Sequence, residues 1–89
     1  MGKTLYHAET LEKDMKRIVG KRAWDKWYNE TDIPCAIDED SYYGRTIEYY
    51  FPYEMREKIV SYMKSHRRSR LYRSWNGMRG ALRFEVYGF

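Results

Sequence analysis

Arginine and tyrosine side chains are interleaved in the last third of the 89-residue chain. An arginine guanidinium donates paired hydrogen bonds to phosphate oxygens, and flat aromatic rings stack on unpaired nucleobases. These residue types together indicate a partner that carries both negative charge and exposed rings, as a nucleic acid does. We expect eight residues of this segment to supply the contacts: Lys64, Arg67, Arg68, Arg70, Tyr72, Arg79, Arg83 and Tyr87.

The distribution of charge supports an anionic partner. The chain has a net charge of +4, but residues 1–63 hold ten lysine and arginine residues against twelve acids. Residues 64–89 hold seven basic residues against a single acid, Glu85. Such a separation of charge along the chain is informative about binding partners and not about the fold. Two alternatives stay open: a protein partner with an acidic surface, or a solvated face whose arginines pair with Glu48 or Glu85.

A second basic cluster lies nearer the N-terminus, in a segment with helical periodicity. Acids one helical turn away, such as Glu9 and Glu12, favour an ordinary solvated helix face. The cluster would extend a nucleic-acid track if its helix lay beside the C-terminal segment. Its members are Lys13, Lys16, Arg17 and Lys21.

Catalysis needs a general acid or base, and the only histidines are His7 and His66. His66 precedes Arg67 and Arg68, a combination that would suit a small basic ribonuclease toxin. No spacing in the sequence supplies a partner base for His66, however. We therefore expect a protein that is not an enzyme, with the ribonuclease as a second alternative.

No pattern for a metal or a cofactor occurs in the sequence, and we expect neither. One cysteine and two histidines cannot form a zinc set, and the acidic run Asp38–Asp40 lacks the spacing of a calcium loop. Cys35 has no cysteine partner for a disulfide, which favours a reducing compartment, and we expect the cytoplasm. Charges at Lys3 and Glu9 argue against a signal peptide, and the apolar runs are too short to span a membrane.

Apolar periodicity predicts the elements of one domain over residues 1–89. Residues 10–29 read as a helix with a bend or break at Gly20, because glycine disfavours helix interiors. Alternation over residues 44–51 predicts a half-buried strand, and the stripe over residues 53–65 predicts a second helix. Pro52 directly precedes this second helix, and proline is well tolerated where a helix starts.

Asn76-Gly77 predicts a two-residue hairpin turn, because this pair accepts the positive φ angles of a type I′ turn. Counting outwards from that turn places Arg70 opposite Arg83 on the solvent side of a strand pair. Two like charges in that position destabilise the sheet, and a bound anion would relieve their repulsion. The same register places Leu71 and Leu82 in the core.

The predicted fold is therefore α+β, with two helices packed on one face of a small antiparallel sheet in the order α–β–α–β–β. Its last two strands form a C-terminal hairpin, and strand order is not readable. A dense aromatic group, Trp24, Trp27 and Tyr28, is either core or an exposed patch for self-association or partner docking.

A short chain rich in tyrosine and tryptophan is similar in composition to small early proteins of tailed phages. That similarity implies an interaction protein that binds and inhibits a host protein, or a host protein–RNA complex, in the host cytoplasm. The residues themselves favour nucleic-acid binding, with RNA preferred because exposed tyrosines on a sheet suit single-stranded or looped substrates. A homo-oligomer is compatible with either function.

Overall fold

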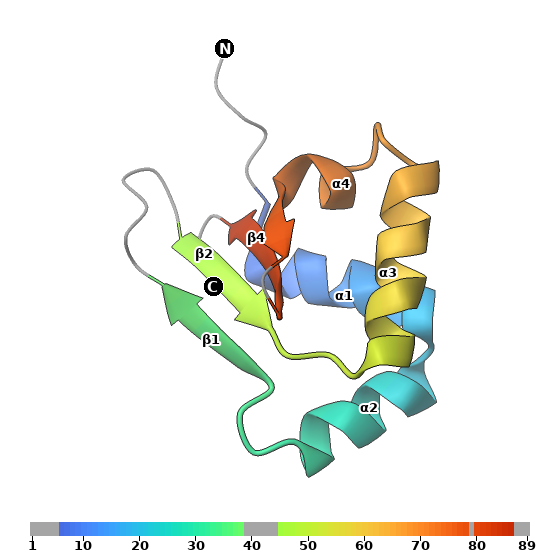
Figure 1. Ribbon diagram of the computed structural model, residues 1–89, viewed down its shortest axis with the longest axis vertical. Coiled ribbons are helices and arrows are strands. Elements are labelled where there is room, and N and C mark those ends of the chain that lie inside the picture. Colours follow the sequence, from blue (N-terminus) through green and yellow to red (C-terminus); the bar gives the residue numbers. More distant parts are fainter. Residues whose placement is uncertain (1–5, 39–44, 79, 87–89) are drawn as a thin grey trace.

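The computed structural model describes residues 6–38, 45–78 and 80–86. Within them the chain forms four helices and one antiparallel sheet of four strands in the order β1-β2-β4-β3 (Figure 1). The α+β class and the C-terminal hairpin are as the sequence predicted, whereas β1 and α4 were not predicted. The elements are α1 (Ala8–Val19), α2 (Lys21–Glu30), β1 (Cys35–Asp38), β2 (Arg45–Tyr49), α3 (Tyr53–Ser65), α4 (Arg70–Ser74), β3 (Trp75–Met78) and β4 (Leu82–Val86).

Gly20 divides the first helical segment as expected. Its φ of 94° lies in a region that side-chain-bearing residues rarely adopt, so the helical path ends there and restarts in a new direction. The Gly20 amide still donates to the carbonyl of Lys16 at 2.8 Å, and the amide of Trp24 donates to the Gly20 carbonyl at 3.0 Å. Two amphipathic helices with different apolar faces result.

The central strands β2 and β4 carry the core face of the sheet. Their register sets Ile47 opposite Phe84 and Tyr49 opposite Leu82, and all four side chains are buried. α1 passes behind these strands in the view of Figure 1, with α3 beside it. The opposite face carries polar side chains, among them Glu48, because side chains alternate along a strand.

The tryptophans of α2 belong to the core. Trp24 and Trp27 are 5% and 7% exposed, and the ring of Trp27 lies 4.6 Å from that of Phe51. The indole nitrogen of Trp27 donates to the carbonyl of Tyr50 at 3.1 Å, which satisfies its polar atom. The two indoles therefore do not form the exposed docking patch considered from the sequence. Tyr28, 41% exposed, is the member of that group that reaches solvent.

Two buried tyrosines fix α1 to the rest of the molecule. The hydroxyl of Tyr49, on β2, donates to Glu12 at 2.9 Å, and that of Tyr6 donates to Asp14 at 2.9 Å. Burial, followed by the adjacent carboxylates, raises the pKa of both phenols well above the ordinary value. Both tyrosines are thus held in the neutral, donating form.

The predicted hairpin register is wrong. Asn76-Gly77 lies inside β3, where the pairing with β4 is irregular, and Trp75 pairs with Phe84 while Met78 pairs with Leu82. Gly77 has a φ of 99°, but no described residue other than glycine has positive φ, so Asn76 cannot complete a type I′ turn. The connection between β3 and β4 instead follows Met78 and includes Gly80, which has a φ of 71°.

A helical turn replaces the first half of the predicted strand. Ser69 begins α4 with its hydroxyl oxygen accepting the amide of Tyr72 at 3.2 Å, an ordinary serine N-cap. Arg70 consequently lies on a helix and not across a strand pair from Arg83, so the expected repulsion between them does not arise. Leu71 is buried nonetheless, as predicted, because helix and strand both turn it inwards.

Unfolding at high pH should test the burial of the Tyr6 and Tyr49 phenols. Their pKa values are raised in the folded state, so their stabilisation is complete below pH ~10 and declines as pH rises further, by up to about 1.4 kcal/mol per pH unit for each tyrosine. Urea unfolding between pH 8 and 11 measures this decline. Tyr49→Phe should remove one of the two contributions and flatten the slope; an unchanged slope would contradict the burial of this hydroxyl.

Candidate nucleic-acid interface

The most cationic surface runs from the end of α3 through the connecting turn and along α4, and we call its five basic residues the cationic turn. All five of its basic side chains are exposed. None of them forms an ion pair with any residue that the structure describes. Its members are Lys64, Arg67, Arg68, Arg70 and Arg73.

The predicted second basic cluster on α1 and α2 is arranged differently, because each of its four members has an acidic partner. Lys16 and Lys21 both approach Asp25, at 3.3 and 3.4 Å, and the hydrogen bond from Lys16 is the main cause of a lowered pKa at that carboxyl. Lys13 lies 3.6 Å from Glu9. The predicted second basic cluster is therefore largely neutralised by its own helices.

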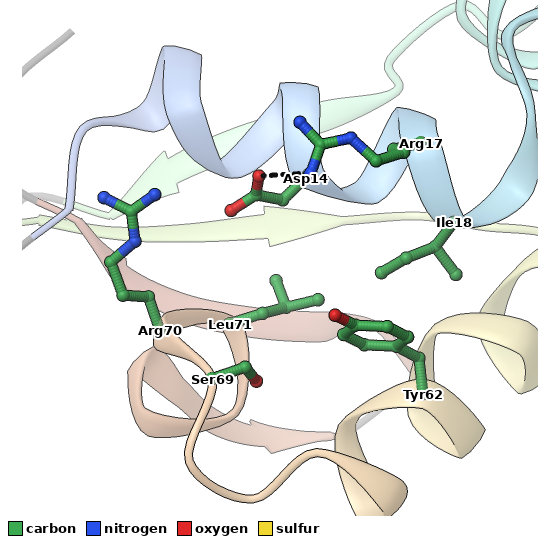
Figure 2. A pocket seen from close by; sticks show the side chains of 7 residues that line it. All are labelled: Asp14, Arg17, Ile18, Tyr62, Ser69, Arg70 and Leu71. Carbon is green, nitrogen blue, oxygen red and sulfur yellow. Dashed lines mark ion pairs between the residues drawn. The ribbon is translucent and has the colours of Figure 1, made fainter.

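Arg17 is the member of the second basic cluster that lines the same hollow as Arg70 of the cationic turn. Its ion pair with Asp14 is long, at 3.8 Å, and its side chain is 80% exposed. Arg17 from α1 and Arg70 from α4 lie on two sides of one hollow, as Figure 2 shows. The floor and walls of this hollow of about 420 Å³ include Ile18, Tyr62 and Leu71.

A second, shallower hollow adjoins the first along the chain. It is lined by the consecutive residues 64–69, so Ser69 contributes to both. The α3 end, the turn and the start of α4 thus form one continuous surface with cations along its length. Neither Tyr62 nor Ser69 was expected from the sequence to line a site, although a serine three residues before Tyr72 is a recognisable helix start.

Several of the predicted contact residues do not belong to this surface. Arg83 lies opposite Glu48 in the β2–β4 register, and its side chain approaches that carboxylate at 3.2 Å. This is the intramolecular pairing that the sequence left open. Tyr72 is partly buried on α4, with its ring 6.0 Å from that of Trp75. Arg79 and Tyr87 lie outside the described residues.

His66 adds a flat ring to the cationic turn. The imidazole stacks on Tyr62 with ring centroids 4.0 Å apart and an interplanar angle of 13°. Its Nδ1 lies 2.9 Å from the carbonyl oxygen of Tyr62, which fixes the orientation of the ring. The residue is exposed and lines the shallower hollow with Lys64, Arg67 and Arg68.

Arg70 is held in place by an aromatic neighbour. Its guanidinium carbon lies 5.2 Å from the centroid of the Tyr6 ring, within the range of a cation–π contact. The hydroxyl of that same ring is bound by Asp14. The side chain is therefore positioned before any ligand arrives, which lowers the entropic cost of binding.

Other site types find no support in the described part of the chain. No group of three metal-ligating side chains occurs there, and no helix there is long and apolar enough to cross a membrane. Cys35 packs against the core, and burial raises the pKa of its thiol. No family model, curated protein or solved structure matches the chain.

Removing the helix cap should show that α4 positions the cationic turn. Ser69→Ala removes the acceptor for the Tyr72 amide and should lower the free energy of unfolding by about 1 kcal/mol. Ser69→Asn keeps a capping oxygen and should restore most of that loss. Urea denaturation measures both variants. Equal stability of all three proteins would favour the extended conformation that the hairpin register had predicted.

Proposed function

We propose that the protein binds nucleic acid, with RNA preferred, through the cationic turn. The observation that carries the proposal is the contrast in pairing between the basic surfaces. Five neighbouring cations without an acidic partner repel one another, and the phosphates of a bound strand relieve that repulsion. Lys13, Lys16 and Lys21, by contrast, lie next to acids and do not need such a ligand.

The residue types also fit phosphate. Four of the five cations are arginines, whose planar guanidinium donates two parallel hydrogen bonds to one phosphate group. Arg17, on the far side of the deeper hollow, adds a further cation to the track, although Asp14 lies 3.8 Å from it and lines the same hollow (Figure 2). A strand that follows the turn would therefore meet arginines from α1, the turn and α4 in succession.

The shape of the site supports RNA over duplex DNA. The chain does place a helix, a turn and a second helix in succession, but α4 has only five residues. At about 1.5 Å per residue it is too short to lie along a major groove as a recognition helix does. A short turn between helices suits single strands and loops, which are common in RNA. The preference for RNA is thus supported by the turn between the helices, and no longer by a sheet surface with exposed tyrosines.

Binding without catalysis is the function we propose, and the cytoplasm is its proposed compartment. The ribonuclease alternative has a direct test, in which a labelled RNA is incubated with excess protein and resolved on a denaturing gel. We expect the RNA to stay intact, because the hollow that His66 lines contains no carboxylate or second histidine to act as its partner in acid–base catalysis. Cleavage that His66→Ala abolishes would instead establish the nuclease.

Salt dependence tests the proposed function. With about four phosphate contacts on a single strand, log affinity should fall against log salt with a slope of about −3. Arg67→Gln with Arg68→Gln should reduce that slope to about −1.5 and cost about 1–3 kcal/mol for each lost contact. Fluorescence anisotropy with labelled RNA at several salt concentrations gives both quantities.

A matched control for this pair is Lys13→Gln with Lys21→Gln, which removes the same charge from acid-paired positions. Its affinity should stay within about twofold of the parent protein, because distant surface charges are screened. Equal losses from the two double variants would mean that net charge, and not the cationic turn, drives binding. Absence of binding at low salt would contradict the proposed function altogether.

A further inference from the structure

We infer that the exposed ring of His66 is a stacking platform for one unpaired nucleobase, so the ligand is a single strand or a loop. The inference rests on the proposed function and specifies its ligand. It starts from the ring pair at the end of α3, where His66 covers Tyr62 at 4.0 Å and 13°.

The platform is already built in the unbound protein. The contact between Nδ1 and the Tyr62 carbonyl limits rotation of the imidazole, and the parallel Tyr62 ring supports it from one side. Among the described residues, no ring other than Tyr62 contacts His66. A base that stacks on the remaining face would extend the Tyr62–His66 pair into a three-ring column.

Positive charge surrounds the ring. Lys64, Arg67 and Arg68 line the same shallow hollow as His66, so phosphates on both sides of a stacked nucleotide would meet cations. Aromatic rings within a positively charged groove are the usual arrangement of proteins that bind single strands without strong sequence preference.

A base-paired ligand does not fit such a platform. Inside a duplex both faces of a base are covered by its neighbours, so a fixed ring on the protein surface has no face to stack on. Stacking on His66 therefore predicts discrimination between strands of equal charge, which phosphate contacts alone would not produce.

The experiment compares three labelled probes by anisotropy at one salt concentration: a single-stranded RNA without self-complementarity, its blunt duplex, and single-stranded DNA of the same sequence. The parent protein should bind the two single strands at least about tenfold more tightly than the duplex. His66→Ala should weaken single-strand binding by about 5- to 100-fold and leave duplex binding and the salt slope unchanged. His66→Phe should restore most of the loss, because it keeps a ring of similar size.

Two further measurements make the result specific. A 2-aminopurine placed in the single strand should lose fluorescence on binding to the parent protein and much less on binding to His66→Ala. The same substitution at the other histidine, His7→Ala, should leave the affinity unchanged, since His7 precedes α1.

Several outcomes would overturn the inference while leaving the proposed function standing. These are salt-dependent binding with no preference for single strands, an unaffected His66→Ala variant, or failure of His66→Phe to restore affinity. A His66 effect confined to RNA would replace ring stacking with a contact to the 2′-hydroxyl. If no probe binds even at low salt, the proposed function itself fails.

Discussion

The hydrogen bonds from two buried tyrosine hydroxyls to the carboxylates of α1 set the arrangement on which the rest of the molecule depends. Tyr49 reaches Glu12 from the sheet, and Tyr6 reaches Asp14 from the segment before the helix. Each phenol would be an unsatisfied buried donor without its carboxylate, which would cost about 1–3 kcal/mol. The Tyr49 bond orients α1 across the sheet, and the acids of α1 are engaged by these tyrosines or by cations of α1 itself.

Because these acids are engaged elsewhere, the cationic turn carries positive charge that they do not compensate. The chain has thirteen acids for seventeen lysine and arginine residues, so basic side chains are in excess. Five of the cations that form no ion pair with a described residue lie around one junction, between α3 and α4. Tyr6 links the two features, because its hydroxyl is held by Asp14 while its ring lies under the guanidinium of Arg70. The contact that anchors α1 therefore also positions a cation of the proposed interface.

The sequence predicted the elements whose signals are strong and local. Gly20 broke the first helix because only glycine readily adopts its φ of 94°, and α3 followed its apolar stripe. The prediction for the C-terminal region was wrong because two signals in the sequence competed there. Asn76-Gly77 is a strong turn pair, but the Ser69 cap and the burial of Leu71 and Trp75 favour a helical turn before it. Pairing with β4 then draws Gly77 into a strand. A tertiary constraint overrode a local preference, as it commonly does.

The change of register alters the kind of recognition that the chain can perform. In the predicted hairpin, Arg70 and Arg83 would have faced a ligand together from a flat sheet. In the structure, Arg83 is held by Glu48, and Arg70 belongs to the turn between two helices. A flat sheet can order several bases side by side, whereas a turn offers contact over a few nucleotides. The proposed binding would use phosphate charge and one stacked ring, so it should depend steeply on salt and tolerate many sequences. Such a site would distinguish nucleic acids by their shape and not by a series of base contacts.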